Sequence, residues 1–389
     1  VAVSASVGLL ISGSVSALAP TWIIFAIIRF GIGVFIGGCL SVWFVFYAEM
    51  IEKRHRTWLS SIFGMPVAHM VFGFLAFCFQ DWRTLSWVTN AFSAPGVLIV
   101  IFLCPESPRW LVQKSRFKEA EKSLLKISSL NCRQIDKEEL RMVLRSEKPP
   151  SHPETYSFWH LFSTWKLSIY SIALAFAWFT TSCVAYGILF NAGKLAGSPY
   201  LNITYYGALK AITGGLVAIL DVCLRKCGRK LIHTGAVSIM LCCTGGALLL
   251  TLVPGPGDLP MALQAIKYVS LVAAGMTTPI WLIIHLVAAE LYPTPIRNLA
   301  NSFCAIFASL GGVAAPQVLY LDEFWRAASF SFYSILLIVD LVAFLALMPE
   351  TKEQAMPERM PDNSERFALC RSRKKGKEED EEDADFELL

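Results

Sequence analysis

The sequence contains two copies of a charged pair with the same spacing. Glu49 precedes Arg56 by seven positions, and Glu290 precedes Arg297 by the same distance. A carboxylate and a guanidinium in this arrangement can form ion pairs, each contributing on the order of 1 kcal/mol when solvent reaches it. The chain shows no constellation of nucleophile and base. We therefore expect reversible ion pairing and no enzymatic catalysis.

A second set of charges lies inside strongly apolar segments: Arg29, Lys210, Lys267 and Asp340. A charge within a bilayer is costly, and it is functional by default. Lys210 is expected to contact an anionic group. Asp340 is expected to meet a cation, or to bridge to one of these basic side chains. Lys267 lies near a segment end and is expected to reach out to the interface.

Arg29 shares a helix face with Gly33 and Gly37, which we expect to pack closely against a neighbouring helix. The alternative for Arg29 is a structural hydrogen bond to adjacent helices.

Proton and metal chemistry find little support. His69, His233 and His285 are candidate proton carriers, but no acid stands at relay spacing from any of them, so packing is the favoured role of each. The eleven cysteines show no repeated ligand spacing. No metal site and no cofactor is predicted.

Composition identifies the elements that must hold these residues. Hydrophobic residues make up 55% of the 389 and charged residues 16%, against about 25% charged in soluble domains. This excludes a water-soluble enzyme, and the net charge of +4 gives no indication of a nucleic-acid partner. Ten apolar segments are each long enough to cross a bilayer as a helix: 1–19, 21–46, 58–79, 86–104, 167–190, 203–224, 231–252, 263–289, 298–320 and 327–348.

The basic residues of the loops predict the orientation. With Val1 on the cytoplasmic side, most loop Lys and Arg fall on that side, and the opposite loops hold only Arg83, Lys194 and Arg326. The tail and the following loops are then cytoplasmic: 47–57, 105–165, 225–230 and 290–297.

The repeated Glu and Arg indicate two parallel bundles, a pattern common in transporters. The second bundle has six segments and the first has four, so we expect two leading helices to be absent from this chain. We predict an incomplete first bundle (1–104), a cytoplasmic loop with short helices (105–165), a six-helix bundle (166–348) and a disordered tail (349–389). The tail is basic and then acidic, which is typical of solvated segments; contacts with lipid headgroups or sorting factors are an alternative.

Several motifs resemble those of the major facilitator superfamily, and most closely its organic cation, anion and zwitterion transporters, solute carrier family 22. The motifs are Pro105-Glu-Ser-Pro-Arg-Trp110, Glu290-Leu-Tyr-Pro-Thr-Pro-Ile-Arg-Asn298, Trp178-Phe179-Thr180 and Pro349-Glu-Thr351. The resemblance spans most of residues 1–358. It implies an all-α membrane protein with the two-bundle fold, about ten of its twelve helices being present.

The resemblance implies a cytoplasmic gate of charges at helix ends. The candidates are Glu49, Arg56, Glu106, Arg109, Arg225, Arg229, Glu290, Arg297 and Glu350. Their alternative role is to anchor helix ends. In the loop 225–230 the family pattern begins with Asp, and Arg225 stands in its place, which alters the charge balance of the gate.

The resemblance also implies a central substrate cavity lined by Arg29, Trp178, Phe179, Tyr186, Lys210, Ser309 and Asp340. Its three aromatic side chains could form a wall for an organic cation or ring; ordinary helix packing is the alternative. Ser309 stands where relatives tend to carry Asp or Arg, Thr213 stands where Glu is expected, and Ala185 replaces a common Tyr. The sign of the substrate's charge therefore cannot be read from these positions.

Together these patterns predict a plasma-membrane transporter that moves small organic ions (cations, anions or zwitterions) by alternating access within the lipid bilayer. A non-transporting receptor, a scaffold or an inactive truncated paralogue is the alternative.

Overall fold

The computed structural model describes residues 2–50, 64–113, 116–131, 136–146, 156–191, 197–223, 228–253, 259–293 and 295–352, together with residues 357, 360 and 367. Within these ranges every regular element is a helix. Apolar helices dominate because backbone N–H and C=O groups have no water to bond in lipid, and a helix satisfies them internally.

Three short helices, α6 (Pro108–Gln113), α7 (Phe117–Leu130) and α8 (Lys137–Ser146), and two 3₁₀ turns, η1 (Phe158–Phe162) and η2 (Leu321–Glu323), accompany the longer helices. The longer ones are α1 (Ala2–Ala17), α2 (Trp22–Met50), α4 (Met65–Cys78), α5 (Trp82–Leu103), α9 (Trp165–Asn191), α10 (Pro199–Cys223), α11 (Arg229–Leu252), α12 (Leu259–Leu291), α13 (Arg297–Tyr320) and α14 (Ala328–Leu347).

Eight of the described helices are long and apolar enough to cross a membrane, and two shorter apolar helices cover Val3–Ala17 and Met65–Cys78. These ten helices coincide with the ten apolar segments of the sequence. The predicted all-α membrane architecture is confirmed.

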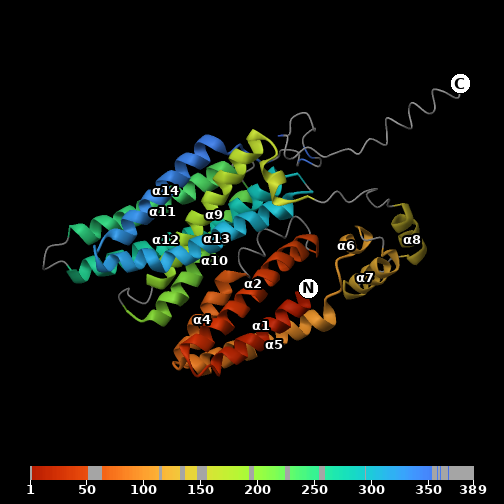
Figure 1. Ribbon diagram of the computed structural model, residues 1–389, viewed down its shortest axis with the longest axis horizontal. Coiled ribbons are helices and arrows are strands. Elements are labelled where there is room, and N and C mark those ends of the chain that lie inside the picture. The colour runs from red at the N-terminus through yellow and green to blue at the C-terminus, as the bar shows by residue number, and fades with distance from the viewer. Residues whose placement is uncertain are drawn as a thin grey trace. The chain divides into compact units, whose positions relative to one another are not determined.

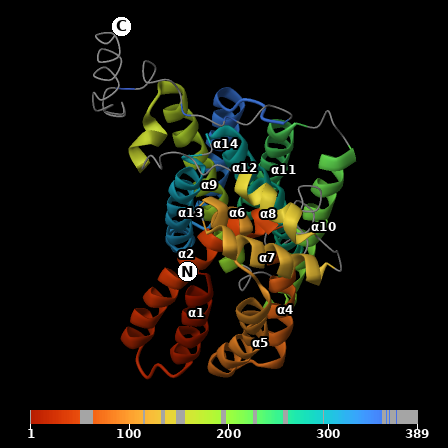
Figure 2. The same ribbon diagram turned by 90° about the vertical axis from the view of Figure 1, so that its right-hand side faces the viewer.

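The chain forms two compact units. The first comprises residues 1–154, 188–225 and 246–279. In it α1 packs against α2 and α5, and α4 packs against α5 and most extensively against α10. Figure 1 shows α1, α2, α4 and α5 side by side, in the red to orange part of the chain, and Figure 2 shows the same helices from the side. At the start of α5, the Asp81 carboxylate accepts a hydrogen bond from the Thr84 amide at 2.8 Å, which caps the helix and lowers the pKa of Asp81.

Glycines allow α4 and α10 to approach closely. A Cβ atom on Gly207 would lie 2.7 Å from the Pro66 carbonyl oxygen and 2.8 Å from the Met70 amide nitrogen, and one on Gly73 would collide with Thr204. The neighbours at Gly207 are backbone atoms of α4, which cannot move without moving the helix. Small residues at such crossings are typical of helix packing in membranes.

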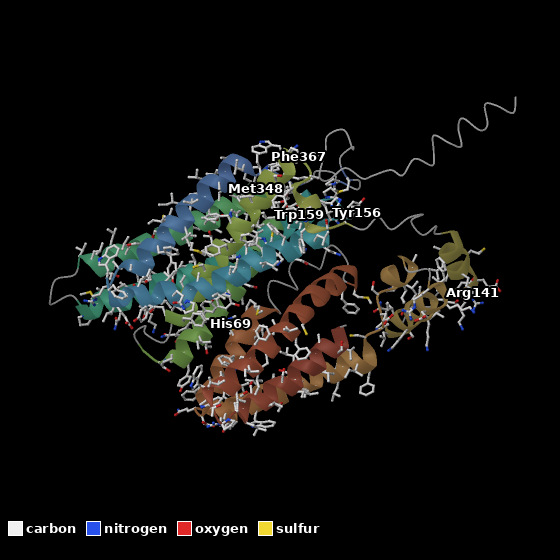
Figure 3. All side chains as sticks on the ribbon, in the orientation of Figure 1. His69, Arg141, Tyr156, Trp159, Met348 and Phe367 are labelled. Carbon is white, nitrogen blue, oxygen red and sulfur yellow. The ribbon has the colours of Figure 1, made fainter. Side chains whose placement is uncertain are left out.

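The three short helices of the loop 105–165 pack on each other. Leu111, Ala120 and Leu144 form a small buried cluster, and the Arg141 guanidinium lies 2.9 Å from the Glu121 carboxylate. Arg141 is labelled on α8 in Figure 3. α7 occupies the stretch in which the apolar spacing predicts a surface helix.

The second unit comprises residues 155–187, 226–245 and 280–389. α9 and α13 meet where Gly311 faces the backbone of Phe179 and Cys183. α11 and α14 run antiparallel, and the Ser334 hydroxyl donates to the Thr244 hydroxyl at 3.2 Å. Beyond α14, the backbone amide of Phe367 donates to the Ser163 carbonyl at 2.8 Å, next to η1.

We expect Gly207→Ala to destabilise the protein, because the added methyl forces α4 and α10 apart at a cost of about 1–3 kcal/mol. Gly31→Ala in α2 is the matched control, since a Cβ atom there meets no described atom within 4 Å and alanine favours the helix. The midpoint of thermal unfolding in detergent should fall for Gly207→Ala and stay level or rise for Gly31→Ala. Equal midpoints for the two variants would contradict the close crossing.

Candidate functional site

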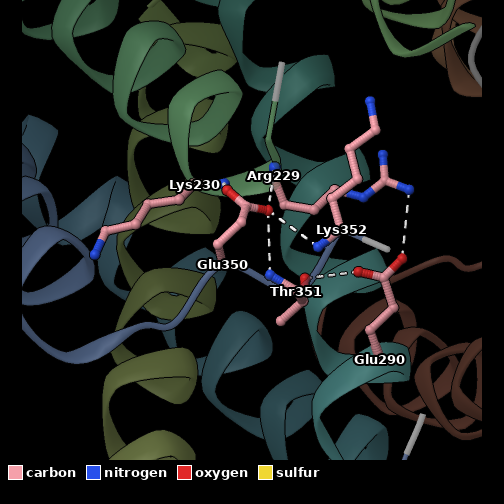
Figure 4. Close-up of polar contacts among 6 residues, drawn as sticks. All are labelled: Arg229, Lys230, Glu290, Glu350, Thr351 and Lys352. Carbon is pink, nitrogen blue, oxygen red and sulfur yellow. Dashed lines mark hydrogen bonds and ion pairs between the residues drawn. The ribbon is translucent and has the colours of Figure 1, made fainter. Parts of the chain in front are cut away.

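Glu350 ties the segment after α14 to the first turn of α11. Its carboxylate accepts hydrogen bonds from the backbone amides of Arg229 (2.7 Å) and Lys230 (3.1 Å). It also accepts from the amides of Thr351 (3.1 Å) and Lys352 (3.0 Å) in its own segment. Figure 4 shows these contacts. A carboxylate at a helix N-terminus satisfies unpaired amides and is stabilised by the helix dipole.

Glu290, at the end of α12, extends this arrangement. Its carboxylate lies 3.3 Å from the Arg229 guanidinium and accepts a hydrogen bond of 2.6 Å from the Thr351 hydroxyl. Both charged side chains are largely buried, with 11% and 16% of their surfaces exposed. Gly228 lies directly beside Glu350, and a Cβ atom there would displace the carboxylate from its present place. We call Arg229, Glu290, Glu350 and Thr351 the charge clamp.

The charge clamp unites three of the predicted gating residues, all within the second unit. Arg297 is the first residue of α13 in the same unit, and its guanidinium donates to the Tyr292 carbonyl at 3.4 Å. Burial raises the pKa of the Tyr292 hydroxyl. Glu106 is exposed. The side chains of Glu49 and Arg109, and residues Arg56 and Arg225, lie outside the described part of the chain. Thr351 was not anticipated, although its place after Glu350 in the Pro-Glu-Thr motif could have indicated it.

Trp178 lies in an aromatic cluster between α9 and α12. Its ring packs edge-on to Trp281 at 5.3 Å and lies 4.2 Å from the His285 ring, between centroids. Only 4% of Trp178 is exposed, and its indole nitrogen has no hydrogen-bond partner among the described residues. The sequence did not indicate Trp281, and it named His285 without its partners, because helical spacing on α12 does not reveal which face meets α9.

The other predicted cavity residues of the second unit differ in exposure. Tyr186 is 45% exposed, and its ring lies next to Gly312 of α13. Phe179 is half-buried and Ser309 is exposed. The Ser309 hydroxyl donates to the Ala305 carbonyl within its own helix at 2.9 Å.

Arg29 is exposed on α2, with its guanidinium carbon 4.9 Å from the centre of the Phe25 ring. A Cβ atom at Gly33 or Gly37 meets no described atom within 4 Å, so the close packing expected there stays a prediction.

Asp340 is buried beside a histidine. Its carboxylate lies 3.3 Å from Nε2 of His233, with 2% and 0% of the two side chains exposed. The His233 ring stacks on Phe344 at 3.7 Å. Spacing along the sequence did not reveal this pair. The two residues are 107 positions apart, and only the antiparallel packing of α11 and α14 brings them together.

Lys210 is buried in α10, in the first unit, with 8% of its surface exposed. Its amine lies 4.4 Å from the centre of the Tyr206 ring. One turn further along, the Thr213 hydroxyl donates to the Gly275 carbonyl of α12 at 2.8 Å. Thr213, which stands at the Glu position of the family pattern, thus joins two helices by a neutral hydrogen bond.

Comparison with known proteins agrees with the motifs. The family described as "Sugar (and other) transporter" matches residues 1–360. A Xenopus laevis protein, solute carrier family 22 member 15-like, is 30% identical over 370 residues, which cover 91% of this chain and 70% of the relative. The chain belongs to solute carrier family 22. A Drosophila melanogaster organic cation transporter protein is 28% identical, over 91% of this chain and 64% of its own length.

Solved structures agree on the fold of this family member. The inward-open xylose transporter XylE from E. coli has a TM-score of 0.63 at 18% identity, over 91% of this chain and 80% of that one. The two-bundle fold of the major facilitator superfamily is thereby confirmed. The chain is a multi-pass membrane protein of a transporter family, and these comparisons favour transport over the receptor or scaffold alternative.

The buried pair of His233 and Asp340 generates a prediction about stability. We expect Asp340→Leu and His233→Leu each to lower stability by about 3–5 kcal/mol, because each leaves a buried polar partner alone. The double variant should be close to the parent, since two apolar side chains replace the pair. Thermal unfolding in detergent measures all three.

The neutral contact between Ser334 and Thr244 on the same helix pair provides the control. Ser334→Ala should cost only about 1 kcal/mol. If the two leucine substitutions instead add their effects in the double variant, His233 and Asp340 do not interact.

Proposed function

We propose that this chain moves small organic ions across a lipid bilayer by alternating access, and that the charge clamp is one of its cytoplasmic gates. The observation that carries the gating proposal is the Glu350 carboxylate, which holds the first turn of α11 to the segment beyond α14. The activity itself is supported by membership of a transporter family and by charges within membrane helices.

The charge clamp has the properties of a reversible latch. It lies at helix ends and consists of hydrogen bonds to carboxylates, each contributing about 1.5–3 kcal/mol. Every partner is a backbone amide, guanidinium or hydroxyl that water can satisfy once the clamp opens. A change of 1.4 kcal/mol shifts a two-state equilibrium tenfold, so breaking one or two contacts suffices to change which side of the carrier is open.

The proposed substrate cavity retains the residues that the family resemblance assigned: Arg29, Trp178, Phe179, Tyr186, Lys210, Ser309 and Asp340. The buried indole N–H of Trp178 and the partly exposed ring of Tyr186 support a solute contact on α9. Asp340 has the weakest support, because its carboxylate is already beside His233.

We further place the protein in the plasma membrane, with loops 47–57, 105–165, 225–230 and 290–297 on the cytoplasmic side. The distribution of basic residues supports this orientation. Contacts of the tail with lipid headgroups or sorting factors are part of the same proposal. Nearly all residues of the tail lie outside the described part of the chain.

The charge clamp is tested with Glu350→Gln, which keeps the shape of the side chain and removes its charge. We expect faster hydrogen exchange at the amides of Arg229 and Lys230, because their acceptor is weakened. A closed cytoplasmic gate stabilises the outward-open state, and this variant weakens that gate. We therefore also expect an initial rate of uptake about threefold to tenfold lower. Exchange is measured on the purified protein, and uptake in cells with surface protein quantified.

Glu323→Gln is the matched control, because Glu323 is exposed in η2 and lies outside the charge clamp. It should leave exchange and uptake unchanged. Parent-like exchange and uptake in Glu350→Gln would refute the gating role. If the parent itself takes up no organic cation, anion or zwitterion while it is present at the surface, the transport proposal fails and the receptor alternative gains support.

A further inference from the structure

Lys210 is a buried cation inside a membrane helix. Its side chain is 8% exposed and lies eleven residues beyond Pro199, the start of α10, about 16 Å along the helix axis at the usual helical rise. At that depth the flexible chain cannot easily place the amine in interfacial water. A charge held there needs a compensating group nearby.

Tyr206 of α10 contacts this amine, and His69 of the crossing helix α4 packs against Tyr206. The centre of the Tyr206 ring, one turn earlier on α10, lies 4.4 Å from the Lys210 amine nitrogen. His69 of α4 packs against the same ring at 5.0 Å, and its Nδ1 lies 2.7 Å from the Met65 carbonyl oxygen. Figure 3 labels His69 where α4 meets α10. The backbone contact fixes the His69 ring, and the His69 ring in turn supports Tyr206.

Among the described residues of the first unit, no acid forms an ion pair with Lys210. The sequence of α4 contains neither Asp nor Glu, and the part of α12 in this unit contains none either. The only acid in α10 is Asp221, about 16 Å further along the helix axis. Within the described part of this unit, the one compensating contact of Lys210 is the face of an aromatic ring, which is weaker than an ion pair.

The neighbours of Lys210 on α10 show which helix this side of α10 faces. Gly207 and Tyr206 face α4, whereas Thr213 and Leu209 face α12 at Gly275. At 100° per residue, Lys210 falls between Tyr206 and Gly207, on the side of α10 that faces α4, and about 60° from Thr213 on the α12 side. Lys210 therefore lies on the side of α10 that faces α4, and not on a lipid-facing side.

From this geometry we infer that Lys210 binds the carboxylate of the transported solute, so that the substrate is an organic anion or zwitterion and not a simple cation. Tyr206 and His69 act as positioning residues that hold the amine in place. The assignment rests on the proposed transport function. The carboxylate supplies the counter-charge that no described residue of this unit provides, and its binding turns a costly buried cation into an ion pair.

The test uses three probes that share one skeleton: 4-phenylbutyrate, 4-phenylbutylamine and the neutral 4-phenylbutanamide. Each is offered to the full chain in two assays, namely radiolabelled uptake into proteoliposomes and thermal stabilisation of the purified protein in detergent. The parent should favour the carboxylate over the amide by about tenfold or more in both assays, as expected for a buried charge-assisted contact. A parent that prefers the amine overturns the inference without any variant.

Lys210→Met removes the charge and keeps much of the side-chain volume. We expect this variant to lose the preference for the carboxylate, and to unfold at a higher temperature than the parent without ligand, because the unpaired buried cation is gone. Lys210→Arg should retain part of the preference. A merely structural lysine would instead leave the ranking of the probes unchanged when substituted.

Lys267→Met is the matched control. Lys267 lies in a membrane helix of the same unit and near a tyrosine ring, with its amine 5.9 Å from the centre of Tyr268, but closer to the helix end. This variant should rank the three probes as the parent does. Equal loss of the preference in Lys210→Met and Lys267→Met would show general electrostatic attraction and refute a site at Lys210.

The two assays separate the inference from the transport proposal. Stabilisation by 4-phenylbutyrate that depends on Lys210, without uptake of any probe, supports the carboxylate site and counts against transport. Uptake with equal rates in the parent and Lys210→Met supports transport and overturns the site.

Discussion

The absence of water around the membrane helices is the constraint on which the rest of this structure depends. A backbone amide or carbonyl in lipid must find its partner within the protein, so the apolar segments become helices. The same constraint applies to charges, because each one inside a span must be neutralised by a partner. Membrane helices gain little from burying apolar surface against one another, so small residues and polar contacts acquire unusual weight. Gly207 at the crossing of α4 and α10 and Thr213 between α10 and α12 show both effects.

The two charges deepest in the described helices are neutralised in different ways. Asp340 has a histidine beside it, both are buried, and Phe344 covers the His233 ring. That arrangement is complete without a solute, which is typical of a structural pair. Lys210 lies against an aromatic ring and forms no ion pair with a described acid of its unit, an arrangement that a bound anion would complete. The contrast between a satisfied and an unsatisfied charge is what separates a structural role from a binding role in this chain, although both were equal candidates by sequence.

The charge clamp shows how the same chemistry changes near the membrane surface. Glu350, Glu290 and Arg229 meet at helix ends, where water can replace each contact that opens. Their interactions are therefore strong enough to bias an equilibrium and weak enough to be reversed. The helix dipole of α11 adds to this, since it aligns the first-turn amides with the carboxylate of Glu350. A gate built from such contacts can respond to binding events of a few kcal/mol, whereas a deeply buried pair such as His233 and Asp340 could not open so readily.

The sequence by itself determined the membrane class, the ten apolar helices, the family and the residues that carry charge within the spans. Apolar length and motif order are local properties, so they can be read along the chain. The pairing of His233 with Asp340, the aromatic cluster at Trp178 and the supporting place of His69 at Tyr206 were decided only by tertiary structure. These residues lie far apart in sequence, and which helix faces meet depends on crossings set by small residues such as Gly207 and Gly311. Periodicity shows the faces of a helix but not the partner that each face will meet, and that is why the charges were found by sequence while their partners were not.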